Sequence, residues 1–120
     1  MTRAVLVVDD SPISRRLAIK QLPPALAVDV TQAGNGVEAL AALRARPIDL
    51  VLLDLNMPVM DGYQFLEALA GTVLPVVIVL SGDIQPKARE RVMALGAAGF
   101  VKKPIHAEGL AQLLGACGLS

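Results

Sequence analysis

The sequence has 120 residues, which suits one domain and is too short for two of ordinary size. Hydrophobic residues make up 54% of it, enough for a packed core, and 11 basic and 11 acidic residues balance without a basic block. This excludes a disordered chain and predicts no direct nucleic-acid or membrane partner. No run of about 18 apolar residues occurs, and Cys117 is the only cysteine, so we expect a cytoplasmic protein.

The first half of the chain predicts two strand–helix units. The apolar run Ala4–Val8 predicts a strand, and a helix follows with Ser11 as N-cap and Pro12 at its first position, ending before a pair of prolines. The second unit consists of a strand at Ala27–Val30 and a helix at about Val37–Arg46, which a glycine-rich turn introduces.

The second half predicts three more units of the same kind. The strands are Leu50–Leu53, Val76–Leu80 and Gly99–Val101, and the helices are about Tyr63–Ala70, Pro86–Leu95 and Ala107–Leu114. Nearly continuous apolar strands are usual where both faces of a parallel sheet are covered. Five alternations therefore predict one α/β domain over residues 1–120, a flavodoxin-like doubly wound (βα)5 fold with a five-stranded parallel sheet of order 2-1-3-4-5.

Polar residues follow the carboxyl ends of the predicted strands, where ligands bind in open sheets of this kind. Asp9 and Asp10 follow the first strand and Asp54 follows the third, its predicted neighbour, while Ser81 and Lys103 follow the fourth and fifth. At about 4 Å and an effective dielectric near 20, each close carboxylate pair costs about 4 kcal/mol, so a cation is needed. Oxygen ligands suit Mg²⁺, and Mg²⁺ with a lysine suits phosphoryl transfer to Asp54 as nucleophile.

Four segments carry a resemblance to a known family: VVDDSPISR near the start, VLLDLNMPVMDG in the middle, VIVLSGD at the fourth strand and GAAGFVKKPI near the end. In this order and spacing, the chain resembles a receiver domain of two-component response regulators over essentially its whole length. The resemblance implies that Asp54 is the phosphoacceptor and that Asp9 and Asp10 help to hold Mg²⁺. It also implies that Asn56 offers its backbone carbonyl to the metal.

The same resemblance gives roles to residues on the other side of the site. It implies that the Ser81 hydroxyl bonds the phosphoryl group, that Phe100 changes rotamer with it, and that Lys103, rather than Lys102, contacts the phosphoryl oxygens. A cis peptide between Lys103 and Pro104 is expected as well. Phosphorylation would then bias the face formed by the fourth helix, fifth strand and fifth helix between two packings.

The implied partners are a histidine kinase or histidine phosphotransfer protein as phosphodonor, and an output protein that binds the switching face. We expect a monomer or weak dimer that catalyses only its own phosphorylation and dephosphorylation. About 17 residues follow Lys103, enough for one helix, which fits both a stand-alone receiver and a receiver excised from a longer protein.

Three other functions fit parts of the pattern. A Mg²⁺-dependent phosphohydrolase with an aspartyl-phosphate intermediate commonly carries a cap domain and a second acid two residues after its nucleophile, where this chain has Asn56. A flavin carrier needs a phosphate loop rich in Ser, Thr and Gly and more stacking aromatics. A degenerate receiver would only dock, although all five site positions are present. Taken singly, Ser81 also fits a turn and Phe100 also fits the core.

Overall fold

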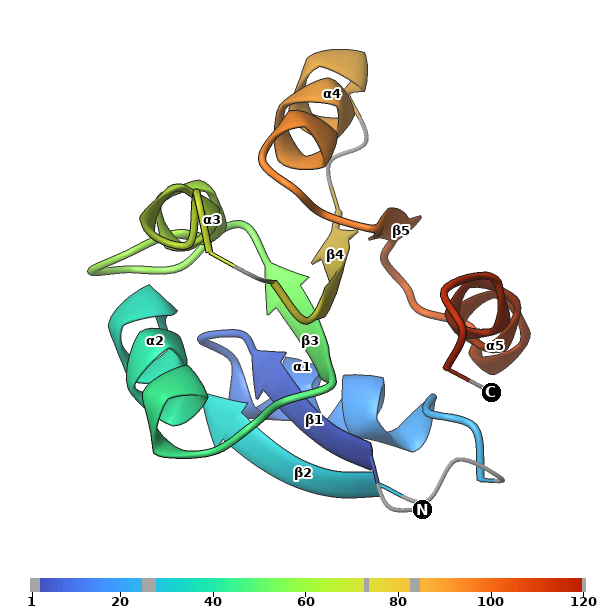
Figure 1. Cartoon of the computed structure of the whole chain (residues 1–120). Helices are drawn as coiled ribbons and strands as arrows, with labels where there is room; N and C mark the ends of the chain where they lie inside the picture. The colour runs from blue at the N-terminus through green and yellow to red at the C-terminus, as the bar shows by residue number, and fades with distance from the viewer. Residues whose placement is uncertain (1–2, 25–27, 73, 83–84, 120) are drawn as a thin grey trace.

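The fold is built around one sheet whose strands all run in the same direction (Figure 1). The computed structural model describes residues 3–24, 28–72, 74–82 and 85–119. Its strands are β1 Arg3–Val8, β2 Val28–Ala33, β3 Leu50–Asp54, β4 Val76–Ser81 and β5 Gly99–Lys102. They lie in the order β2-β1-β3-β4-β5 and every neighbouring pair is parallel. The predicted flavodoxin-like, doubly wound arrangement is confirmed.

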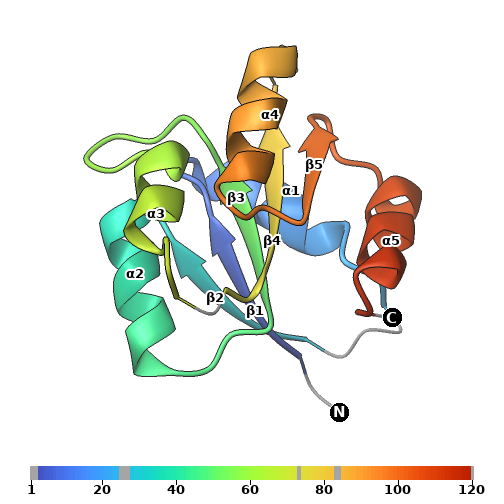
Figure 2. The same ribbon diagram turned by 45° about the horizontal axis from the view of Figure 1, so that its top comes forward.

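Helices cover both faces of this sheet, as the two views in Figures 1 and 2 show. They are α1 Pro12–Lys20, α2 Gly36–Ala45, α3 Gly62–Ala68, α4 Pro86–Ala94 and α5 Ala107–Ala116. The core cluster on one face includes Ala39, Phe65 and Val92, from α2, α3 and α4. The cluster on the other face includes Ala18 of α1 and Leu110 of α5. The central strand β3 is buried along its whole length between them, which explains its continuous apolar sequence.

Side-chain caps start the helices that flank the carboxyl end of the sheet. Ser11 caps α1 and Asn35 caps α2, each accepting a hydrogen bond from the backbone N–H three residues on. Asp61 and Gln64 form a reciprocal capping box at the start of α3. These caps fix the points at which the chain turns away from the strand ends.

The predicted strand at Ala27–Val30 was too short at its carboxyl end, because β2 continues to Ala33. β2 pairs only with β1 and forms a border of the sheet, where polar residues such as Thr31 and Gln32 are tolerated. Ala27 lies outside the described residues. The other predicted boundaries agree within two residues, the usual uncertainty of element ends. Within the described ranges, no helix has both the length and the apolar character needed to cross a membrane.

Candidate functional site

The carboxyl ends of β1 and β3 bring three carboxylates together. The strands are paired up to Val8 and Leu53, so the next residues, Asp9 and Asp54, follow side by side. Asp9 is 6% exposed and Asp54 is 7% exposed, whereas Asp10 lies open to solvent. One carboxylate oxygen from each of the three lies within 4.8 Å of the others. The three aspartates that the sequence proposes as metal ligands therefore share one site.

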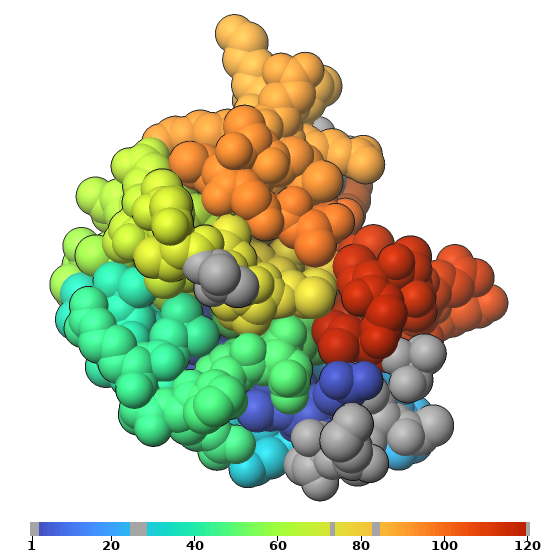
Figure 3. Space-filling model, in the orientation of Figure 1, coloured from blue at the N-terminus to red at the C-terminus, as the bar shows by residue number. Residues whose placement is uncertain are grey.

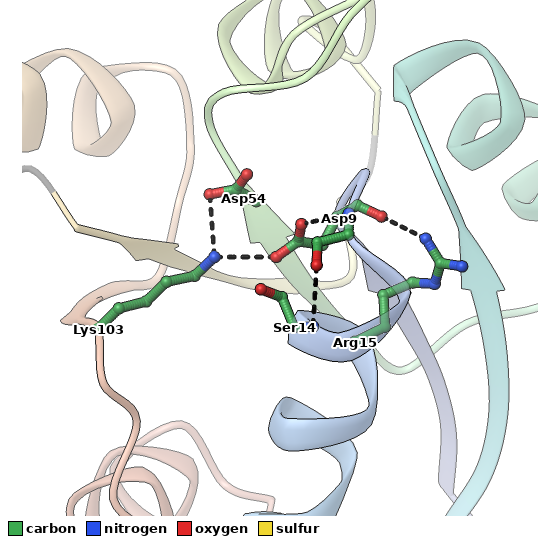
Figure 4. Close-up of polar contacts among 6 residues, drawn as sticks. Asp9, Ser14, Arg15, Asp54 and Lys103 are labelled. Atoms are coloured by element: carbon green, nitrogen blue, oxygen red, sulfur yellow. Dashed lines mark hydrogen bonds and ion pairs between the residues drawn. The ribbon is translucent and has the colours of Figure 1, made fainter.

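Lys103 is the cation that faces this cluster (Figure 4). Its Nζ lies 2.9 Å from Oδ2 of Asp9 and 3.4 Å from Oδ1 of Asp54. The backbone N–H of Lys103 donates to the carbonyl of Ser81 at 2.8 Å, which extends the pairing of β5 with β4 up to this residue. The following peptide, Lys103–Pro104, is cis, as predicted. Position 103, and not the exposed residue 102, thus turns into the site.

Asp9 also makes three hydrogen bonds besides its ion pair with Lys103. The N–H of Ser11 donates to its Oδ1 at 2.9 Å, and its own N–H donates to the carbonyl of Ala33 at 3.1 Å. The Arg15 guanidinium donates from Nη1 to the Asp9 carbonyl oxygen at 2.6 Å (Figure 4). The sequence interpretation did not include Arg15. Its one signal was its place in the first turn of α1, from which side chains reach back toward the helix start.

The charges of the site shift two pKa values. Burial raises the pKa of the Asp54 carboxyl, and the negative charge of Asp9 adds to the rise, while Lys103 opposes it. Burial alone would lower the pKa of Lys103, but its hydrogen bond to Asp9 and the charge of Asp54 outweigh that effect and raise it. Lys103 therefore stays protonated, and Asp54 is a more basic carboxylate than an exposed aspartate.

Lys103 balances only part of the negative charge. Three ionised carboxylates and one ammonium leave two negative charges. The buried carboxylates of Asp9 and Asp54 lie within 4.8 Å of each other, and at that distance their repulsion costs about 3.5 kcal/mol for an effective dielectric near 20. Every ligand atom in the cluster is an oxygen. A compact site of carboxylate oxygens with this residual charge suits a hard divalent cation such as Mg²⁺.

The loop that leaves β3 returns to the strand end. The N–H of Gly62 donates to the carbonyl of Leu55 at 3.1 Å. A β-carbon at Gly62 would lie 2.6 Å from the carbonyl oxygen of Asp54, so the close approach requires glycine. Asn56, the predicted source of a backbone ligand, lies exposed in this loop. Val59, further along, has a φ of 70° and is 81% exposed.

The two predicted switch residues lie on β4 and β5. Ser81 is 1% exposed and directly follows Leu80, the register partner of Asp54, so it sits beside the end of β3. Phe100 is partly buried and packs against the core cluster beneath α3 and α4. Phe100 thus occupies a core position, whereas Ser81 lies at the rim of the site.

Fold and site together define a doubly wound α/β domain with an acidic, lysine-containing site at the carboxyl ends of β1 and β3. The family model for the response regulator receiver domain matches residues 5–115. The chain belongs to this family and is a receiver domain of the two-component response regulators.

Sequence and structure comparisons agree with this assignment. The chain is 39% identical over 112 residues to the sensor histidine kinase RcsC of Salmonella typhi, which covers 92% of this chain and 12% of that protein. The receiver domain of the putative response regulator NarL from Mycobacterium tuberculosis superposes with a TM-score of 0.85 at 31% identity, over 97% of this chain and 95% of that one. The chemotaxis response regulator CheY4 of Vibrio cholerae superposes with a TM-score of 0.81 at 30% identity, over 97% of this chain and 98% of that one.

Proposed function

We propose that residues 1–120 form one receiver domain that accepts a phosphoryl group on Asp54 from the phosphohistidine of a histidine kinase or histidine phosphotransfer protein. The supporting observation is the buried Asp54 carboxylate, which lies 3.4 Å from Nζ of Lys103 and beside the carboxylates of Asp9 and Asp10. An oxygen of Asp54 would attack phosphorus. The P–N bond to the donor histidine would break, the imidazole would leave with the electron pair, and an acyl phosphate would form.

The metal we propose for this reaction is Mg²⁺, held by the carboxylates of Asp9, Asp10 and Asp54 and by the backbone carbonyl of Asn56. When bound, Mg²⁺ supplies positive charge against the carboxylates and the phosphoryl oxygens. The oxygen-only donor set and the two uncompensated charges support this choice. Lys103 would move from its carboxylate partners to the phosphoryl oxygens, and the exposed Asp10 leaves the site open on the solvent side.

We propose Ser81 and Phe100 as the residues that pass the change on to an output protein. The Ser81 hydroxyl would donate to a phosphoryl oxygen, and Phe100 would repack beneath α4. The light anchoring of α4 supports this, because Val92 is its one buried residue. In the space-filling view, α4 projects beyond the rest of the surface (Figure 3). The face built by α4, β5 and α5 is then the surface for the output protein.

A pocket beside Lys103 suits the docking of the phosphodonor. It measures about 460 Å³ and is lined by Ser14, Leu17, Gln21, Lys103, Pro104 and Ile105, between α1 and the turn before α5. Leu17 is 55% exposed, and Ile13 on the same helix is 68% exposed. Because Lys103 lines both this pocket and the acidic site, a donor that covers these apolar side chains brings its phosphohistidine to Asp54.

We also propose that the domain is cytoplasmic, which its single, half-buried cysteine supports, and that it is a monomer or a weak dimer.

The phosphoacceptor is tested by intact-protein mass after incubation with acetyl phosphate, with Mg²⁺ or with EDTA. We expect a gain of one phosphoryl group that needs Mg²⁺ and is absent in Asp54→Asn. Asp49→Asn is the matched control, because Asp49 lies at the opposite end of β3 and bonds the N–H of Ala4. No gain in folded wild type, or an equal gain in Asp54→Asn, would refute the proposal.

The docking surface is tested by comparing a small donor with a protein donor. Leu17→Ser is expected to leave phosphorylation by acetyl phosphate unchanged and to slow transfer from a phosphorylated histidine phosphotransfer domain. Val37→Ser, at a 49% exposed apolar position on α2, should alter neither reaction. Equal effects of both variants on the protein donor would contradict docking at α1.

A further inference from the structure

We propose that Arg15 is a positioning residue for the metal site: its guanidinium fixes the peptide between Asp9 and Asp10 and so holds both carboxylates in the arrangement that binds Mg²⁺. The inference rests on the proposed function, because it concerns the cation affinity of the same site.

Arg15 makes two directed hydrogen bonds at once. Its Nη1 donates to the carbonyl oxygen of Asp9 at 2.6 Å, and its Nε donates to Oε1 of Gln32 at 2.8 Å. Asp9 follows β1 and Gln32 lies in the neighbouring β2, so a side chain from α1 ties two strand ends together. The planar guanidinium presents both donors in a fixed geometry, which a lysine ammonium cannot reproduce.

The Asp9 carbonyl matters because it belongs to the peptide that leads into Asp10. The orientation of this peptide sets the direction in which Asp10 leaves the strand. Across residues 3–24, 28–72, 74–82 and 85–119, the Asp10 carboxylate has no hydrogen-bond or ion-pair partner. The backbone therefore sets the direction in which this side chain starts, and no hydrogen bond or ion pair among the described residues adds to it. In Figure 4, Arg15 and Lys103 reach Asp9 from opposite sides, the first at the backbone and the second at the carboxylate.

The contact is not an ion pair. Both acceptors of Arg15 are neutral oxygens, and no carboxylate of the described residues lies within 4.0 Å of its guanidinium. By charge alone, an arginine next to a cation site weakens cation binding. As a support for the ligands, the same arginine strengthens it. The two effects have opposite signs, so removal of the side chain separates them.

The experiment is a titration of metal-free, ¹⁵N-labelled protein with MgCl₂, followed by backbone amide shifts. Loss of a group that orients metal ligands typically lowers affinity by about 10–100-fold, which is the loss we expect for Arg15→Met. Arg15→Lys keeps the unfavourable charge but not the guanidinium geometry and should lose at least as much, whereas Gln32→Ala leaves the bond from Arg15 to Asp9 in place and should lose less. Arg16→Met is the matched control, since Arg16 is the exposed neighbour on α1. The Mg²⁺ affinity of this variant should differ from that of wild type by less than about twofold.

A second measurement separates positioning from folding. The metal-free thermal midpoint of each variant is read by circular dichroism, and a positioning role requires that affinity falls even where the midpoint is close to that of wild type. Arg15→Met that binds Mg²⁺ as tightly as wild type, or more tightly, would overturn the inference. If Arg15→Met does not fold, Arg15→Lys and Gln32→Ala decide the matter in the same titration.

The outcomes also distinguish this inference from the proposed function. Wild type that binds no Mg²⁺ would overturn the metal site and this inference with it. Wild type that binds Mg²⁺ and is phosphorylated on Asp54, together with an unimpaired Arg15→Met, would overturn only the role of Arg15.

Discussion

Val59 is a β-branched residue in a backbone conformation that favours glycine, and its replacement by glycine is expected to stabilise the protein. Its φ is 70°, and the N–H of Met60 donates to the carbonyl of Pro58 at 2.8 Å, which closes a tight turn around it. The left-handed region costs an L-residue about 1–2 kcal/mol. Because the side chain is 81% exposed, its removal loses little packing.

The gain is reduced by the greater freedom of glycine in the unfolded chain, about 0.5–1 kcal/mol, which leaves a net stabilisation of about 0.5–1 kcal/mol. For 120 residues the unfolding entropy is about 0.25 kcal/mol per kelvin, so the thermal midpoint should rise by about 2–4 °C.

The assay is thermal unfolding of metal-free protein followed by circular dichroism. Val59→Ala keeps the β-carbon and should change the midpoint little. Val37→Gly, at an exposed helical position, should lower the free energy of unfolding by about 0.5 kcal/mol. A lower midpoint for Val59→Gly, or an equal rise for Val59→Ala, would refute the argument from backbone strain.

Three further predictions concern the site, each measured by chemical unfolding. Gly62→Ala should cost about 2 kcal/mol, because its β-carbon would meet the Asp54 carbonyl oxygen at 2.6 Å, whereas Gly115→Ala has open space in α5 and should stabilise by about 1 kcal/mol; equal effects would contradict this. Lys103→Met removes the ammonium 2.9 Å from Asp9 and should cost about 2 kcal/mol in EDTA but less in Mg²⁺, so the same loss in both would count against the charge balance. Burial raises the pKa of Asp54, so the folded protein binds the proton of this carboxyl more tightly than the unfolded chain does. The resulting stabilisation is complete below the ordinary pKa of 3.8 and is lost as pH rises through the folded-state pKa. Asp54→Asn should therefore stabilise metal-free protein more at neutral pH than near pH 3.8, and a gain independent of pH would exclude this origin.

The fold could be predicted from the sequence wherever burial is two-sided. β3 and β4 are covered on both faces, so their residues are almost all apolar and their boundaries are visible. β2 has a strand neighbour on one side only, and Thr31 and Gln32 meet solvent there, so its polar carboxyl half carried no apolar signal. Sequence reasoning therefore predicted the order of the strands but missed the carboxyl half of β2, the strand at the border of the sheet.

The site was predictable to the extent that side-chain chemistry marks it. Asp9, Asp54 and Lys103 are charged residues at or just after the carboxyl ends of strands, and parallel topology alone places such residues at one end of a sheet. Arg15 and Val59 were not predictable in this way. The acceptor of Arg15 is a backbone carbonyl, which every residue possesses, and the strain at Val59 lies in a dihedral angle.

The arrangement of charge links the site to the rest of the sheet. Asp9 and Asp54 are buried with one ammonium between them, so the metal-free site carries excess negative charge that a divalent cation would neutralise. A phosphoryl group on Asp54 would carry about two negative charges in place of the single carboxylate charge, so the site would gain about one negative charge. Lys103 would follow the phosphoryl group, and its backbone N–H is bonded to the carbonyl of Ser81, at the end of β4. β4 leads toward α4, whose one buried residue is Val92, so a change of charge at the end of β3 would act on this helix.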